Sequence, residues 1–203
     1  MNRSVSYYQN DKFKKLATVK NDDSFQKFTK NQIKNRSLHM NLFLLFLSIL
    51  PLIIISIFFF TYAPIEEFLI QIGLGILFGL FLIPIHELLH GLYLRVLGSK
   101  NIKYELNLRK FKFGCYAEQF VLSRREYHSF LLAPFMLITF LLLILAIGFS
   151  LVSVLFLSMM LLHVSLCFGD FALVNFSSLL EEDEVFAYYD SQAKQTIFLS
   201  RKS

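Results

Sequence analysis

His86-Glu87-Leu88-Leu89-His90 follows an uncharged run, residues 68–85, that is apolar enough to enter a lipid bilayer. In a helix, residues four apart lie about 40° apart around the axis, so both imidazoles occupy one face. That spacing suits one zinc ion held by two histidines, with Glu87 beside it as a general base toward water. Ionisable side chains at membrane depth are costly and are therefore candidates for function. The alternative is that these last turns reach the headgroups, where the three side chains are simply solvated.

The composition is that of an integral membrane protein, because 55% of the residues are hydrophobic and only 17% are charged. Residues 42–60 form a further uncharged run, and residues 129–169 form a third. As one helix the third run would measure about 61 Å, twice the hydrocarbon thickness of about 30 Å, so it must turn back, most plausibly at Gly148-Phe149-Ser150. We expect a mainly α-helical fold with four transmembrane helices, at about 41–62, 68–97, 127–148 and 151–175.

The basic residues are distributed unevenly along the chain. Residues 1–40 carry nine Lys and Arg against three Asp, and residues 98–126 carry seven against three Glu. The connection 61–67 contains two glutamates and no basic residue. The positive-inside rule then predicts a multi-pass protein of the cytoplasmic membrane with both termini in the cytoplasm. The net charge of +5 is thus explained by topology and by contact with anionic lipid, and we expect no nucleic-acid partner.

Three regions follow from this pattern: a basic cytoplasmic arm over residues 1–40, a membrane domain over 41–178, and a cytoplasmic tail over 179–203. Within the membrane domain, residues 101–122 alternate apolar and polar side chains, first at Ile102, Tyr104, Leu106 and Leu108 and again from Phe111 and Phe113. A two-residue period is typical of strands. We expect a small β-hairpin or meander after the His-Glu helix; the alternative is an irregular linker.

The second helix carries a stripe of small residues. Gly75, Gly79, His86 and His90 lie within about 60° of one another on the helical wheel. Small residues four apart let another helix approach closely. Pro84 removes a backbone donor two residues before His86 and loosens the helix there. The face that holds the histidines is therefore also expected to be tightly packed.

A catalytic zinc usually has three protein ligands and one open position. Depth in the membrane favours Asp170 as the third ligand. Asp170 lies about as far along the fourth span as His86 lies along the second. An unpaired carboxylate there would cost about 2.5–3.5 kcal/mol, which a cation offsets. The alternative for Asp170 is a solvated helix end. The other candidates are His163, Cys167, Cys115, His128 and His39; His163 is alternatively a packing histidine, and Cys167 a small buried residue.

The order of these features resembles a known family. Four features follow one another: His86-Glu87-x-x-His90, a short β segment, Leu132-Ala133-Pro134 opening a helix, and Gly169-Asp170. Together, over residues 65–190, they resemble the bacterial membrane family of putative zincin peptidases, which is similar in style to the site-2 proteases. The resemblance implies zinc held by His86, His90 and Asp170, Glu87 as the catalytic base, and cleavage near the cytoplasmic membrane boundary. The chain lacks the Asn-x-x-Pro and Asp-Gly sequences of site-2 proteases, so no residue is assigned to stabilise the oxyanion.

We therefore expect an intramembrane zinc metallopeptidase that acts on a membrane protein or peptide, with His163, Cys167 and Gly169 supporting the metal or binding substrate. A second hypothesis is a non-catalytic membrane adaptor, immunity factor or regulator in which zinc staples two helices together. A third is a metal or proton carrier that uses His86, Glu87, His90 and His163 as a relay, although one such face offers no obvious path through four helices.

Overall fold

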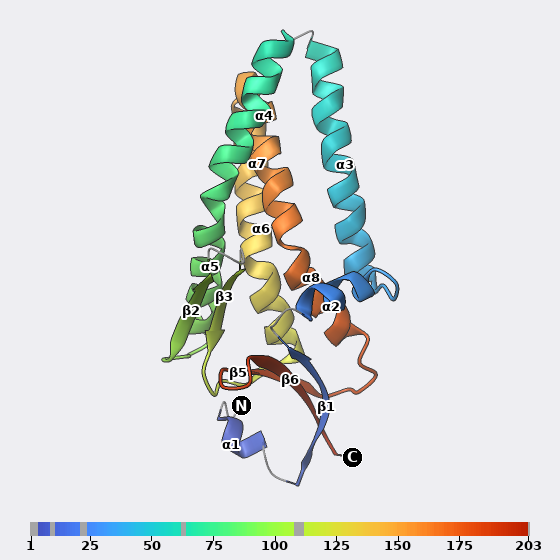
Figure 1. Ribbon diagram of the computed structural model, residues 1–203, viewed down its shortest axis with the longest axis vertical. Helices are drawn as coiled ribbons and strands as arrows, with labels where there is room; N and C mark the ends of the chain where they lie inside the picture. The colour runs from blue at the N-terminus through green and yellow to red at the C-terminus, as the bar shows by residue number, and fades with distance from the viewer. Residues whose placement is uncertain (1–3, 9–10, 21–23, 62–63, 108–111, 203) are drawn as a thin grey trace.

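Long helices stand on a layer of strands in the computed structural model, which describes residues 4–8, 11–20, 24–61, 64–107 and 112–202 (Figure 1). The short helix α1 (Val5–Tyr8) and the last strand, β6 (Gln195–Arg201), both lie in that layer of strands. We call this end of the molecule the sheet end. The described N-terminal and C-terminal elements are therefore on the same side of the helices.

Three helical segments are long and apolar enough to cross a membrane. They are α3 (Leu38–Thr61), α4 (Ile65–Leu80) continued by α5 (Leu82–Val96), and α6 (Arg124–Gly148). The pair α7 (Ser153–Leu166) and α8 (Phe168–Ser178) supplies a fourth crossing if the two are counted as one span. Their outer faces expose large apolar side chains, among them Leu52, Phe60, Leu77, Phe81, Met136, Phe140 and Ile147. The fold is mainly helical, as the hydropathy predicts, and the predicted number of four crossings is reached if the bent pair is one span.

The second crossing is interrupted at Phe81, whereas the hydropathy pattern predicts one helix over 68–97. Pro84 explains the interruption. A proline has no N–H, so the Leu80 carbonyl cannot receive its usual helical hydrogen bond, and the proline ring crowds that carbonyl. Phe81 N–H instead bonds the Phe78 carbonyl at 3.0 Å, in the tighter pattern typical of a helix end.

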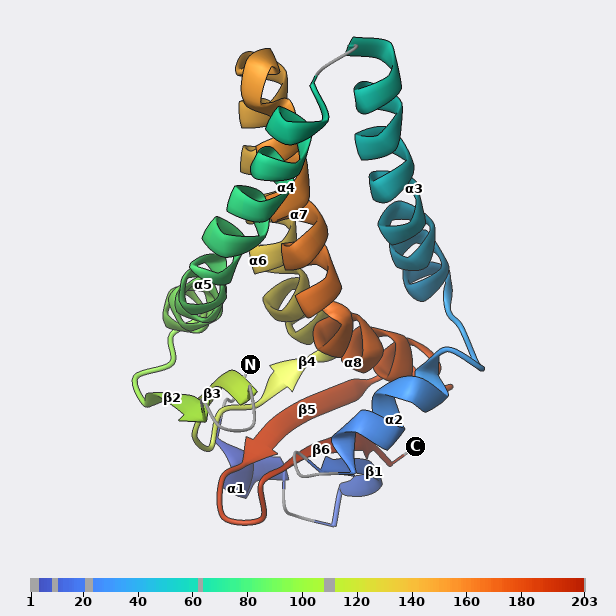
Figure 2. The same ribbon diagram turned by 45° about the horizontal axis from the view of Figure 1, so that its top comes forward.

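The fourth crossing is also not one straight helix, so the prediction of a continuous helix over 151–175 is wrong. The predicted turn after α6 is confirmed, because α6 ends at Gly148 and a 3-10 turn, η2 (Ser150–Val152), precedes α7. At Cys167, however, the axis bends by 46° into α8. The bend carries α8 across the sheet end below the other helices (Figure 2).

A buried asparagine fixes the far part of α8. Asn175 donates from Nδ2 to Gln32 Oε1 at 3.0 Å and to the Asn35 carbonyl at 2.8 Å. Its Oδ1 accepts the Ser37 N–H at 2.6 Å. These bonds join α8 to the segment between α2 (Phe25–Gln32) and α3. Because a buried polar group is costly when unpaired, the network favours a single position for α8.

Small residues bring α4 against α7, as the glycine stripe predicts. A Cβ atom built on Gly75 would lie 2.5 Å from the Leu155 carbonyl oxygen and 2.6 Å from Ser158 Cβ. On Gly79 it would lie 2.9 Å from a terminal methyl carbon of Leu162. The two helices therefore touch through backbone, and α7 is held beside the helix that carries the histidines.

The predicted hairpin is confirmed as β2 (Ile102–Asn107) paired antiparallel with β3 (Lys112–Ala117). The register joins Ile102 to Ala117 and Asn107 to Lys112. Residues 108–111, and with them the Leu108 and Phe111 positions of the predicted alternation, lie outside the described residues. The hairpin packs against α5 and so stands next to the His-Glu motif.

A second sheet is not predicted by the sequence pattern, which places an arm at residues 1–40 and a tail at 179–203. Four antiparallel strands are ordered β1 (Phe13–Lys20), β6, β5 (Val185–Asp190) and β4 (Leu122–Ser123). The arm and the tail are thus paired with each other. Residues 1–3, 9–10, 21–23 and 203 of these two regions lie outside the described residues.

An apolar core joins this sheet to the helices. Phe198 and Val174 are fully buried there, and Leu94 of α5 is 2% exposed. Tyr127 of α6 stacks edge to face on Phe198 with ring centroids 5.6 Å apart. The ends of α5, α6 and α8 therefore rest on one packed surface, which fixes their relative positions.

We predict that Gly75→Ala destabilises the protein by about 1–3 kcal/mol. The new methyl group would clash with the Leu155 carbonyl of α7, which is backbone and cannot rotate away as a side chain can. Thermal unfolding in detergent measures the change. Gly73→Ala is the matched control, since a Cβ there has nothing within 4 Å among the described residues. Equal stability of the two variants would contradict close packing of α4 on α7.

Candidate metal centre

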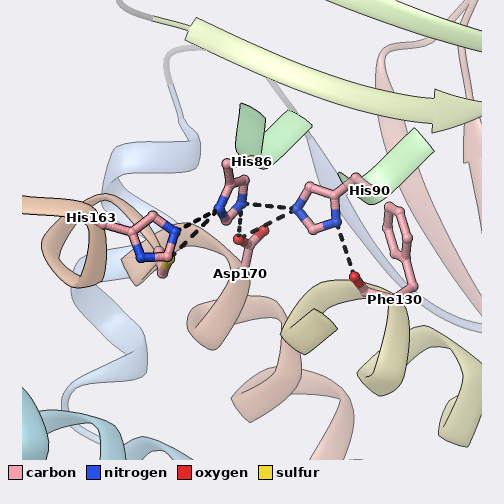
Figure 3. A network of polar contacts seen from close by, with 6 residues as sticks. His86, His90, Phe130, His163 and Asp170 are labelled. Carbon is pink, nitrogen blue, oxygen red and sulfur yellow. Dashed lines mark hydrogen bonds and ion pairs between the residues drawn. The ribbon is translucent and has the colours of Figure 1, made fainter. Parts of the chain in front are cut away.

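Three polar side chains converge near the sheet end of the helices (Figure 3). His86 and His90 project from successive turns of α5, and Asp170 projects from the first turn of α8. The two Nε2 atoms are 3.0 Å apart. Asp170 Oδ2 lies 3.1 Å from His86 Nε2 and 3.6 Å from His90 Nε2. The bend at Cys167 is what turns the Asp170 carboxylate toward the two rings.

This triangle fits a zinc ion. Ligands at 2.0–2.2 Å in a tetrahedron are about 3.3–3.5 Å from one another, close to the separations found here. Two imidazoles and one carboxylate are also a ligand set that catalytic zinc uses, with a fourth position open. Two neutral imidazoles cannot both point lone pairs at each other favourably without a proton or a cation between them. His86, His90 and Asp170 are thus suited to hold zinc.

The orientation of His90 is fixed by a backbone carbonyl. His90 Nδ1 lies 2.9 Å from the Phe130 carbonyl oxygen on α6. A carbonyl only accepts, so Nδ1 carries the proton and donates, which leaves the Nε2 lone pair of the neutral ring for a metal. The Phe130 carbonyl is available because its usual helical partner would be the N–H of residue 134, which is Pro134. The proline in α6 therefore serves the metal site on α5.

His86 is held from its other side. Its Nδ1 lies 3.2 Å from His163 Nε2 on α7. The thiol of Cys167 is 3.8 Å from the same Nδ1 and 3.6 Å from His163 Nε2. His163 and Cys167, which the sequence suggests as supporting residues, thus contact His86. Gly169 lines the adjacent cavity, and a Cβ atom built on it would lie 3.5 Å from the Phe25 ring, an ordinary contact.

Glu87 and the metal triangle open into one cavity of about 880 Å³. The Glu87 Oε2 atom is buried and has no hydrogen-bond partner among the described residues. The cavity is bounded by α5, α8, β3 and the turn between β5 and β6. A buried carboxylate oxygen facing a cavity is a costly arrangement that a catalytic group can require.

Two contacts across the cavity join the hairpin to the larger sheet. The rings of Tyr116 of β3 and Tyr189 of β5 pack at an angle of 40° with centroids 4.4 Å apart. Lys194, in the turn after β5, lies 3.6 Å from the Glu105 carboxylate of β2. The site is therefore covered at the sheet end by protein, and eight phenylalanine and tyrosine side chains are among the residues that line the cavity.

The remaining ligand candidates lie apart from the triangle. His128 bonds Ser177 Oγ at 2.7 Å, and its ring packs edge-on against His39. Cys115 lines the cavity on β3, and burial raises its pKa to about 12. None of these three belongs to the clusters of metal-binding side chains in the described part of the chain.

Comparison with known proteins gives one match. A family described as "Putative zincin peptidase" matches residues 79–180. The matched region runs from the end of α4 to the end of α8 and contains the three converging side chains, Glu87 and the hairpin. No curated protein and no solved structure matches the chain.

Removing the carboxylate tests the proposed ligand set. Asp170→Ala should lower the affinity for zinc by more than roughly 100-fold, since losing an outer-shell partner alone costs 10–100-fold. Zinc content by mass spectrometry and competition with a chelator measure the change. Asp183→Ala, at an exposed carboxylate beyond α8, should leave zinc binding unaltered. Equal zinc affinity of the two variants would exclude Asp170 as a ligand.

Restoring a helical hydrogen bond tests the role of Pro134. In Pro134→Ala the new N–H competes for the Phe130 carbonyl, so zinc affinity should fall by roughly 10-fold. Pro51→Ala, a substitution in the middle of α3 away from the triangle, is the control. An unchanged affinity in Pro134→Ala, with both variants folded, would show that the freed carbonyl is unimportant.

Proposed function

Because the chain belongs to the family of putative zincin peptidases, which covers half of it, we propose that it is an intramembrane zinc metallopeptidase. The observation that carries this proposal is the triangle of His86 Nε2, His90 Nε2 and Asp170 Oδ2, with edges of 3.0, 3.1 and 3.6 Å. Glu87, between the two histidines, faces the same cavity. Ligands, a base and space for a substrate therefore lie together.

The chemistry proposed is hydrolysis of a peptide bond. Zinc, when bound by His86, His90 and Asp170, supplies a Lewis acid that polarises a carbonyl and lowers the pKa of a water to about 7. Glu87 accepts a proton from the attacking water as the water oxygen joins the carbonyl carbon. Glu87 then gives that proton to the amide nitrogen as the C–N bond breaks. The products are one carboxylic acid and one amine, and Glu87 ends as it began.

The hairpin offers a means of binding an extended substrate. A peptide bond inside a helix is shielded, so a segment to be cleaved must be locally extended. Residues 113–117 of β3 line the cavity, and among the described strands β3 pairs only with β2. A substrate segment can pair with such an edge through main-chain hydrogen bonds. The aromatic lining, including Phe120, Phe130 and Tyr127, favours apolar substrate side chains.

The setting proposed is the cytoplasmic side of the bacterial inner membrane. The exposed apolar side chains of the helices support a lipid environment. Both N-terminal and C-terminal strands lie at the sheet end, together with the described parts of the basic segments 1–40 and 98–126. Basic connections stay in the cytoplasm, which supports this orientation.

A non-catalytic protein in which zinc staples α5 to α8 uses the same three ligands. Such a protein has no need of Glu87, nor of a cavity beside the metal. The two functions therefore differ in what a substitution at Glu87 changes.

Glu87→Gln should keep zinc within about twofold and lower cleavage by at least roughly 100-fold, because a glutamine cannot carry the proton. New peptide termini in membranes from producing cells, read by mass spectrometry, report cleavage. Purified protein acting on membrane-anchored reporters with an extended segment gives the rate.

Glu67→Gln is the matched control, since it makes the same change at an exposed site at the start of α4. It should cleave as the unaltered protein does. Unchanged cleavage in Glu87→Gln would remove Glu87 from the mechanism. Loss of stability on zinc removal, with no cleavage by the unaltered protein, would favour the staple.

A further inference from the structure

The His86 ring has a second polar neighbourhood, on the edge opposite Asp170. Its Nδ1 is 3.2 Å from His163 Nε2 and 3.8 Å from Cys167 Sγ. Cys167 Sγ is 3.6 Å from His163 Nε2. Figure 3 shows His163 and Asp170 on different sides of His86. Two nitrogens and one sulfur thus form a second triangle that shares only the His86 ring with the first.

The dimensions of this second triangle fit a metal ion. With nitrogen at 2.0–2.1 Å and sulfur at 2.3 Å, a tetrahedral ion separates two nitrogens by about 3.3 Å and nitrogen from sulfur by about 3.6 Å. The observed edges are within a few tenths of an ångström of these values. A thiol is a weak hydrogen-bond donor, so it gains little from these two contacts alone.

The surroundings also suit a bound cation. Cys167 has no exposed surface and His163 is 2% exposed, so both side chains lie inside the protein. His163 Nδ1 is buried without a hydrogen-bond partner among the described residues, so no other protein group fixes the ring. His86 and His163 both line the cavity of about 880 Å³, which gives an ion a way in.

We propose that His86, His163 and Cys167 form a second metal position, for thiophilic cations such as Cd²⁺, Cu⁺ or Zn²⁺. Thiolate ligands select such ions, and the thiol proton leaves when the metal binds. The two positions compete for His86. A neutral imidazole has one lone pair, so a metal on Nδ1 leaves the proton on Nε2 and removes His86 from the set with His90 and Asp170. An excess of a thiophilic metal would then displace the ion from the first position.

The test uses the full-length protein in detergent with Cd²⁺ as the probe. A sulfur-to-cadmium charge-transfer band in the ultraviolet reports a thiolate ligand. We expect the band in the unaltered protein and in Cys115→Ser, which removes the only other cysteine. Cys167→Ser and Cys167→Ala should lose it. His163→Ala should weaken Cd²⁺ binding, followed through the same band, by at least roughly 10-fold, as expected for a lost ligand.

Asp170→Asn separates the two positions and the two proposals. It should keep the Cd²⁺ band, because the second triangle does not include Asp170. The proposal is overturned if the unaltered protein shows no band, if the band survives in both Cys167 variants, or if Asp170→Asn abolishes it in a folded protein. None of these results bears on zinc binding by His86, His90 and Asp170. The affinity of that site for zinc is measured separately, by chelator competition with Asp170→Ala.

Discussion

A carboxylate and two imidazoles meeting in an apolar helical bundle set the constraint on which this structure depends. In such a place a charge is tolerated only when it is paired or bound to an ion. Asp170 lies beside both rings, and His90 and Phe130 form a buried hydrogen bond next to them. The bend at Cys167 and the Asn175 network position Asp170, while the glycine contacts hold α7 beside α4.

Two prolines near the site each leave the backbone carbonyl four residues earlier without its usual helical hydrogen bond. Pro134 leaves the Phe130 carbonyl without a helical donor, and His90 takes it. Pro84 interrupts the second crossing just before His86. In a membrane, freed backbone carbonyls are tolerated where side chains or neighbouring helices pair with them. A residue that weakens its own helix can therefore strengthen a metal site on another.

The features that could be predicted from the sequence are those with local periodicity or fixed spacing. The apolar runs predict the crossings, the alternation from Ile102 predicts the hairpin, and the four-residue spacing of His86 and His90 places both rings on one face. The bend at Cys167 has no proline to signal it. Pairing of β1 with β6 joins residues more than 170 positions apart, for which a single sequence carries no direct signal. The hydrogen bond from His90 to Phe130 depends on how α5 packs against α6, which the sequence does not indicate.

The central claim is that two nitrogens from α5 and one oxygen from α8 bind a single zinc ion. X-ray absorption spectroscopy on zinc-loaded, full-length protein tests it most directly. The account predicts two imidazole nitrogens and at least one oxygen at about 2.0–2.2 Å, with no sulfur at about 2.3 Å when zinc is not in excess. A first shell with sulfur, or one without two imidazoles, would contradict it.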